Sequence, residues 1–142
     1  NKAVREFKRQ SGERVEVWIL QEQPVYIIVN PLEFELVIIN LLRNAAQALQ
    51  ELGVLNSKVA LTIKREDNKA LIAIEDNGHI EKEKIEKLSE PTNSTKADGL
   101  GLGLQIVRSI IENHGGKIFF SRAASGGLRV EIRLPAEETT EQ

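Results

Sequence analysis

Three amide side chains recur at helical spacing in the segment between Asn30 and Gly53. Asn40, Asn44 and Gln47 stand at i, i+4 and i+7 in a stretch that is otherwise largely apolar. Asparagine is a poor helix former, so two of them inside one helix need a reason. One interpretation is a solvated face with no role. The other is an amide oxygen that faces a cleft and ligates a hard cation such as Mg²⁺, which prefers oxygen ligands.

A second candidate group is the carboxylate of Asp76. It is in phase with Ile72 and Ile74, so the alternation of a strand points it toward the buried face. Gly78 follows and would let a ligand approach the backbone. The residue either caps the turn that starts at Asp76 or accepts a hydrogen bond from an exocyclic amine such as that of adenine.

The third candidate is the run GLGLGL from Gly99 to Leu104. It is either a hinge or the start of a helix whose free backbone N–H groups and dipole bind phosphate. The run matches neither G-x-x-x-x-G-K-[ST] nor G-x-G-x-x-G, and a polar segment precedes it instead of a strand, so P-loop and Rossmann sites are excluded.

Composition limits the kinds of protein that can carry these groups. The 142 residues fit one domain, with 41% hydrophobic and 28% charged residues. No apolar run approaches the about 20 residues of a spanning helix. The absence of cysteine excludes disulfides and thiolate sites, and two histidines disfavour a histidine-rich metal site. The net charge of -2 argues against nucleic-acid binding.

Hydrophobic periodicity predicts an α+β domain. The expected strands are 15–19, 25–29, 59–63, 69–75, 117–122 and 128–134, and the expected helices are 31–52, 81–88 and 104–113. Hairpin connections favour a two-layer α/β sandwich, with a mixed, mostly antiparallel sheet covered on one face by three helices. We expect a linker or the end of an upstream helix at 1–12, the domain at 13–136 and a disordered tail at 137–142.

The order of these features resembles one family. A helix with Asn40-Leu41-Leu42-Arg43-Asn44 precedes a strand that ends in Asp76-Asn77-Gly78, and a polar segment then leads to the glycine run and to Glu112-Asn113-His114-Gly115-Gly116. This order resembles the catalytic ATP-binding domain of two-component sensor histidine kinases. The run from Asn40 to Leu49 looks most like the nitrogen- and oxygen-sensing branch. The resemblance implies the Bergerat ATP-binding fold.

By motif position, the resemblance implies that Asn44 holds Mg²⁺ near the phosphates of ATP, with Asn40 beside it, and makes these two the catalytic residues. Asp76 would take the adenine amino group, with Gly78 against the ring. Further nucleotide contacts would come from Arg43, Gln47, Lys96, Gly99, Leu100, Gly101, Leu102, Gly103 and Leu104, most of them in a glycine-hinged lid.

The resemblance also implies a reaction. Related ATPases carry a glutamate where this chain has Asn40, and an amide cannot accept a proton from water, so transfer of the γ-phosphoryl group fits better than hydrolysis. The acceptor would be a histidine on a separate dimerisation domain, and a response regulator receiver domain would be the downstream partner. We expect a cytoplasmic domain that contacts neither nucleic acid nor membrane, with room for an inner-membrane anchor in the full-length protein.

Three departures from the family pattern surround the same expected pocket. His79-Ile80 follows Gly78 where a second glycine is usual, the segment 89–96 lacks the usual phenylalanines, and Leu128 replaces a common threonine. These departures support an alternative, a degenerate, nucleotide-dead regulatory domain of the same fold.

Overall fold

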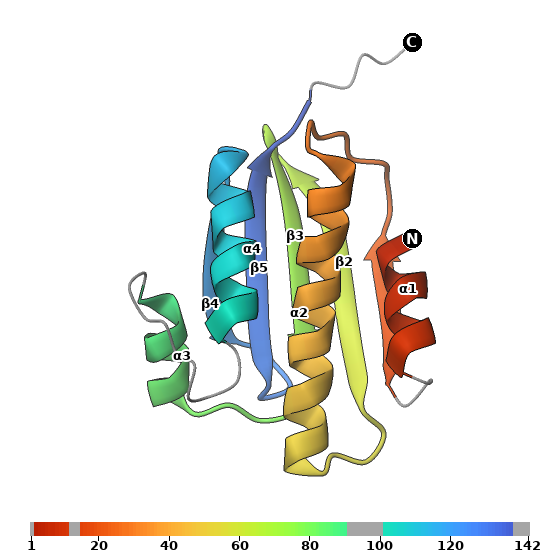
Figure 1. The fold of residues 1–142 in the computed structure, drawn as a ribbon, viewed down its shortest axis with the longest axis vertical. Helices are drawn as coiled ribbons and strands as arrows, with labels where there is room; N and C mark the ends of the chain where they lie inside the picture. The colour runs from red at the N-terminus through yellow and green to blue at the C-terminus, as the bar shows by residue number, and fades with distance from the viewer. Residues whose placement is uncertain (1, 12–14, 91–100, 138–142) are drawn as a thin grey trace.

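A computed structural model describes residues 2–11, 15–90 and 101–137 of the chain (Figure 1). In this part of the chain a five-stranded sheet is accompanied by helices on one face and at one edge. In chain order the elements are α1 (Lys2–Ser11), β1 (Glu16–Gln21), α2 (Pro31–Leu52), β2 (Lys58–Glu66), β3 (Lys69–Asp76), α3 (Lys82–Ser89), α4 (Gly101–Asn113), β4 (Lys117–Arg122) and β5 (Leu128–Pro135).

The sheet has the strand order β1-β2-β3-β5-β4. β1 pairs with β2 in parallel, and the other neighbouring strands are antiparallel. β3 therefore lies in the middle of the sheet, with β2 and β5 on its two sides. Its last residue, Asp76, is in register with Val59 of β2. The predicted mixed, mostly antiparallel sheet is confirmed.

α2 begins and ends at the residues that the sequence indicates. The Asn30 side chain accepts a hydrogen bond from the backbone N–H of Glu33 at 3.0 Å, and Pro31 occupies the first helical turn, where no N–H is needed. Gly53 ends the helix in the left-handed conformation with φ of 69°, which glycine adopts without strain. These two ends fix the register of the face that carries Asn40 and Asn44.

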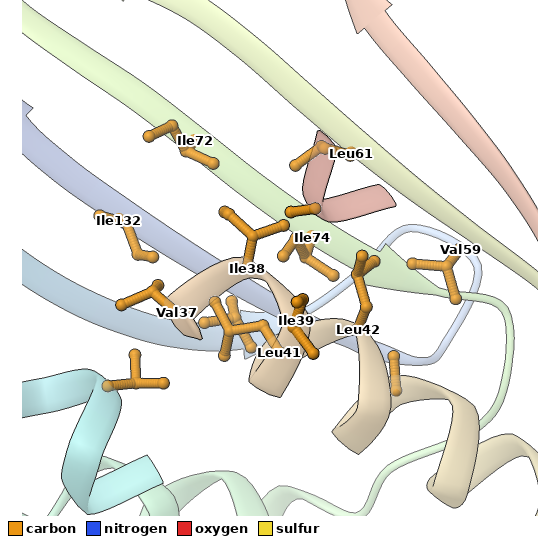
Figure 2. Close-up of a cluster of buried hydrophobic side chains, with 14 of the residues drawn as sticks. Val37, Ile38, Ile39, Leu41, Leu42, Val59, Leu61, Ile72, Ile74 and Ile132 are labelled. Atoms are coloured by element: carbon orange, nitrogen blue, oxygen red, sulfur yellow. The ribbon is translucent and has the colours of Figure 1, made fainter. Parts of the chain in front are cut away.

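The core lies between α2 and the covered face of the sheet. Figure 2 shows Ile38 and Leu42 of α2 facing Leu61 of β2 and Ile74 of β3. These side chains are at most 2% exposed. Burial of each such side chain contributes on the order of 1.5–3 kcal/mol, so this contact fixes α2 over the sheet.

Three helices lie side by side over this face in Figure 1, namely α1, α2 and α4. α3, which we had expected among the covering helices, packs beside the edge strand β4 instead. Residues 1–12 were expected to be a linker or the end of an upstream helix. Residues 2–11 form α1, and Ala3, Val4 and Phe7 are buried in the core. The domain limits at 13 and 136 stay predictions.

The strand predicted at 25–29 is wrong. The segment is not part of the sheet, although Ile27 and Val29 are half-buried against the core, Val25 is also half-buried, and the residues between them are exposed. The alternation that suggested a strand therefore reflects one-sided packing of an extended connection. Among the described residues, a single backbone hydrogen bond joins it to the chain after β5, from the N–H of Glu137 to the Tyr26 carbonyl at 2.7 Å, instead of a strand ladder.

No helix in the described parts of the chain is long and apolar enough to cross a membrane.

The uncovered face of the sheet carries a network of ion pairs. Arg129 binds Glu75 and Glu131, and Arg133 binds Glu131 with its Nε at 2.6 Å. Partial burial favours the neutral form of the Glu131 carboxyl, but hydrogen bonds from Arg133 and Arg129 outweigh this and lower its pKa below the ordinary value of 4.5. The ionised form of Glu131 therefore stabilises the folded state.

Glu131→Gln should be less stable than the wild type near neutral pH. Because the pKa of Glu131 is lowered on folding, its contribution is present above about 4.5 and is lost as the pH falls through the folded-state value. We expect the free energies of unfolding of the two proteins to converge in acid, as measured by urea titration. Glu66→Gln, at the more exposed pair with Lys64, is the control and should change little. A gap that is independent of pH would contradict this account.

Candidate functional site

A cavity of about 270 Å³ lies between α2, the end of β3, the start of α4 and the segment 79–84. Apolar side chains form most of its walls, and Asn44 and Asp76 are the polar groups among them that the sequence had singled out. The lining residues are Leu41, Asn44, Ala45, Ala48, Glu51, Leu52, Ile74, Asp76, His79, Ile80, Glu81, Lys84, Leu104, Leu128 and Val130. The structure thus brings the amide of α2 and the carboxylate of β3 to one cavity.

Asp76 is 5% exposed and is the one buried charged residue among those that the structure describes. Its Oδ1 accepts a hydrogen bond from the backbone N–H of Gly78 at 2.9 Å. Burial raises the pKa of the carboxyl above its ordinary value of 3.8, and hydrogen bonds from the backbone of Gly78 and Leu128 offset only part of that rise. A buried carboxylate of this kind has spare acceptor capacity for a donor on a ligand.

The turn between β4 and β5 holds Asp76 in place. A Cβ atom on Gly127 would lie 2.2 Å from both the carbonyl oxygen and Oδ1 of Asp76, so only glycine fits there. The Ser125 hydroxyl donates to the Asp76 carbonyl oxygen at 3.0 Å, and the N–H of Ile80 donates to the Gly126 carbonyl at 3.1 Å. Backbone contacts therefore fix the carboxylate from two sides.

Asn44 has a buried side-chain nitrogen, Nδ2, without a hydrogen-bond partner in the described part of the chain. Such a group costs free energy unless a ligand or water satisfies it. Asn40, one turn earlier, donates from Nδ2 to the Leu36 carbonyl at 2.9 Å. A Cβ on Gly103 would lie 3.3 Å from Asn40 Oδ1 and 3.9 Å from Asn44 Nδ2, so the first turn of α4 approaches both amides.

The other predicted site residues are less close to the cavity. Gly78 packs against Leu49 and Leu52 and does not line it. Arg43 and Gln47 are exposed on α2 and also stay outside. Within the glycine run, Leu104 lines the cavity, and Gly103 lies beside the two amides. Gly101 and Leu102 belong to the first turn of α4, whereas Lys96, Gly99 and Leu100 lie outside the described residues.

Several lining residues were missed by the sequence analysis. Glu51 carries a charge to the cavity from the last turn of α2, Glu81 does so from the position before α3, and Lys84 does so from the first turn of α3. Helical spacing gave a signal for Glu51, which stands seven residues after Asn44. Nothing in the charged run of α3 distinguishes Lys84 from its exposed neighbours, so this residue needed the fold.

The donor set near Asn44 fits a metal that is shared with a ligand, but not one held by protein side chains alone. Among the described residues there is no group of three or more His, Cys, Asp or Glu side chains that could hold an ion. Mg²⁺ usually takes one or two protein ligands and completes its shell with phosphate oxygens and water. The unsatisfied amide of Asn44 matches this requirement, since the side-chain amide can turn to present its oxygen.

A two-layer sandwich whose cavity lies between an amide-bearing helix and an acidic strand end defines an ATP-binding domain of the Bergerat type. Residues 29–138 match the family described as histidine kinase-, DNA gyrase B- and HSP90-like ATPases, and the chain belongs to this family. It is of the histidine-kinase type, as its relatives and structural neighbours show.

Among curated relatives, the sensor protein TdiS of Thauera aromatica is 38% identical over 109 residues, which are 73% of this chain and 20% of that protein. Sporulation kinase B of Bacillus subtilis is 38% identical over 70% of this chain and 23% of its own length. The sensor protein FixL of Bradyrhizobium diazoefficiens is 33% identical over 79% of this chain and 22% of its own length. The chain thus spans only about a fifth of the relatives that it matches.

Among solved structures, the catalytic domain of histidine kinase ThkA has a TM-score of 0.74 and 28% sequence identity. The likeness covers 95% of this chain and 91% of that one. The mycobacterial sensor histidine kinase MprB shares the fold with a TM-score of 0.76 at 21% identity. The predicted α+β sandwich of the Bergerat type is therefore confirmed.

Asp76→Asn should not destabilise the domain near neutral pH. Because the pKa of Asp76 is raised on folding, the folded protein binds this proton more tightly, so the contribution of Asp76 to stability falls as the pH rises from 3.8 through the folded-state pKa. We expect the free energy of unfolding of Asp76→Asn to equal or exceed the wild-type value near neutral pH, as measured by urea titration. Asp67→Asn, in the exposed β2–β3 turn, is the matched control. A large loss of stability in Asp76→Asn would give the carboxylate a structural role instead.

Proposed function

We propose that this domain binds Mg·ATP in the cavity and donates the γ-phosphoryl group to a histidine on a separate dimerisation domain, as the catalytic part of a two-component sensor kinase. The observation that carries the proposal is the shared cavity of Asp76 and Asn44, with Gly103 of α4 against Asn44. The names of the relatives, which include sensor proteins and kinases, support this class of activity.

The chemistry of the Asp76 end suits an adenine ring. Ile74, Leu128 and Val130 give a flat base an apolar floor on the sheet. The Asp76 carboxylate beside them accepts a hydrogen bond and, when ionised, has no proton to donate, so it selects an exocyclic amine over a carbonyl oxygen. Because Asp76 is already desolvated, leaving its remaining acceptor sites unpaired costs free energy, and an amine on the ligand relieves that cost.

The Asn44 end suits the phosphates. α4 begins at Gly101, and the free N–H groups of a helix start attract phosphate. Asn44 would hold Mg²⁺ through its amide oxygen, with Asn40 beside it. The ion, when bound, would neutralise charge on the phosphate oxygens. Contacts from Arg43, Gln47, Lys96 and the remaining residues 99–104 of the predicted lid belong to this proposal.

Asn40 favours phosphoryl transfer over hydrolysis. Its side-chain nitrogen donates to the Leu36 carbonyl, and its amide oxygen lies toward Gly103. An amide does not accept a proton at neutral pH, so it supplies no general base for water. The residues then promote transfer by orienting ATP and by electrostatic stabilisation.

The acceptor histidine would lie on another domain. His79 pairs with Glu81 at the cavity, and His114 is bonded to the Ile110 carbonyl and the Asn30 N–H at the ends of α4 and α2. Neither histidine lies on the exposed face of a helix. A response regulator receiver domain would accept the phosphoryl group from the acceptor histidine, and a domain that uses ATP in this way would act in the cytoplasm.

The second candidate function is a nucleotide-dead regulatory domain. The observation that favours it is the altered strand end, where His79 and Ile80 line the cavity in place of the usual glycine. Saturable binding of ATP at millimolar concentration would exclude this candidate, and its absence would favour it.

Calorimetric titration with Mg·ATP tests the assigned roles. We expect Asp76→Asn to weaken binding by about tenfold or more, since a hydrogen bond to a charged group is worth about 1.5–3 kcal/mol. Asn44→Leu should remove the part of the ATP affinity that depends on Mg²⁺. Gln50→Ala, exposed on the same helix, is the control and should bind like the wild type. Unchanged affinity in both site variants would reject these roles.

The domain alone should release no measurable phosphate from ATP. The reason is the amide at position 40, which cannot deprotonate the attacking water. A phosphate-release assay at saturating Mg·ATP measures this. Steady turnover by the purified domain, abolished by Asp76→Asn, would show an ATPase instead of a phosphotransferase.

A further inference from the structure

The end of the cavity that is remote from Asn44 carries a group of charged side chains. Glu51 lies seven residues after Asn44 on α2, about 10 Å further along the helix axis at 1.5 Å per residue. Gly78 packs on Leu49 and Leu52 at the same end, which places the neighbouring Asp76 carboxylate there as well. This is the end at which the proposed function puts the base.

Most of these charged groups have polar partners. His79 Nε2 lies 3.0 Å from Glu81 Oε2, and Gln47 Nε2 donates to Glu51 at 3.2 Å. Lys84, on the first turn of α3, differs. It is half-buried and lines the cavity, and its backbone N–H donates to the Glu81 carbonyl at 3.1 Å. Its side chain, however, makes no hydrogen bond, ion pair or ring contact with any residue that the structure describes. Within the described part of the chain, the ammonium group of Lys84 therefore lines the cavity without a side-chain partner.

We propose that Lys84 is a specificity-determining residue that donates a hydrogen bond to the base of the bound nucleotide. The proposal rests on the proposed function, because it needs an adenine nucleotide in this cavity. The exocyclic amine of adenine is flanked by ring nitrogens that accept hydrogen bonds, such as N7. Asp76 would accept a hydrogen bond from the amine, and Lys84 would donate one to a ring nitrogen. Together they would recognise two adjacent groups on one edge of the base.

Position distinguishes the base from the phosphates as the target of Lys84. Lys84 lies one helical turn after Glu81, whose carboxylate pairs with His79, whereas the amides that would hold Mg²⁺ lie near the start of α4. The carboxylates of Glu51 and Glu81, which line the same cavity, would repel a triphosphate but not an uncharged base. A contact with the base is therefore the arrangement that the surrounding charges favour.

The test compares adenosine, ADP and Mg·ATP as ligands of the wild type, Lys84→Ala and Lys84→Gln. We expect Lys84→Ala to weaken all three by a similar factor, roughly threefold to tenfold for one charged hydrogen bond that is open to solvent on one side. Lys84→Gln keeps a donor and should recover part of the loss. Lys82→Ala, exposed on the same helix, is the control and should bind like the wild type.

A second arm uses 7-deaza-ATP and 1-deaza-ATP, which replace one ring nitrogen by C–H. One of these two analogues should bind the wild type more weakly than ATP does. The same analogue and ATP should bind Lys84→Ala with equal affinity, because the ring nitrogen and the Lys84 ammonium group are the two partners of one hydrogen bond. Equal deaza effects in the wild type and Lys84→Ala would overturn the proposal.

Three other outcomes also overturn it. A loss in Lys84→Ala that grows with the number of phosphates would assign Lys84 to the phosphates. Unchanged affinity for all ligands would leave it without a role in binding. Absence of binding by the wild type would overturn the proposed function as well, and so this failure is distinguishable from the other two.

Discussion

A carboxylate withdrawn from water at the end of the central strand is the constraint on which the site depends. Asp76 is 5% exposed, and an ionised group at such a position is tolerated only where donors surround it. The backbone of Gly78 and Leu128 supplies those donors, and Gly127 leaves the room that they need. The second glycine of the β4–β5 turn, Gly127, is thus required because the neighbouring strand ends in a buried acid.

The same requirement explains where β3 lies. A carboxylate at a sheet edge would be solvated and would have no need of a ligand, whereas β3 has β2 and β5 on its sides and α2 above it. α2 in turn is fixed by its caps and by Leu42 and Ile38 in the core, which sets the height of Asn44 over the sheet. The position of Asn44 along α2 and that of Asp76 along β3 therefore determine where the cavity lies.

Local signals predicted most of the fold, and the exceptions have physical reasons. The caps at Asn30 and Gly53 and the two hairpins are properties of adjacent residues, so the sequence alone was sufficient to place them. The strand predicted at 25–29 was wrong because an extended segment with one buried side shows alternating apolar and polar residues whether or not a neighbouring strand pairs with it. Asn44 and Asp76 were found because unusual residue types interrupt a regular pattern. Lys84 could not be predicted as a lining residue, because only the fold shows which side of α3 meets the cavity.

The hydrogen bonds around Asp76 have an entropic consequence. The Ser125 hydroxyl donates to the Asp76 carbonyl, and the backbone N–H of Gly78 donates to the Asp76 carboxylate. The nearby Ile80 N–H donates to the Gly126 carbonyl. These hydrogen bonds restrict the Asp76 carboxylate before any ligand binds. Ordering flexible side chains usually consumes about 0.5–1.5 kcal/mol each on association. In the proposed contact with a ligand donor, a carboxylate that the backbone already holds in place would avoid that loss, so its attraction for the donor would be expressed almost fully as affinity.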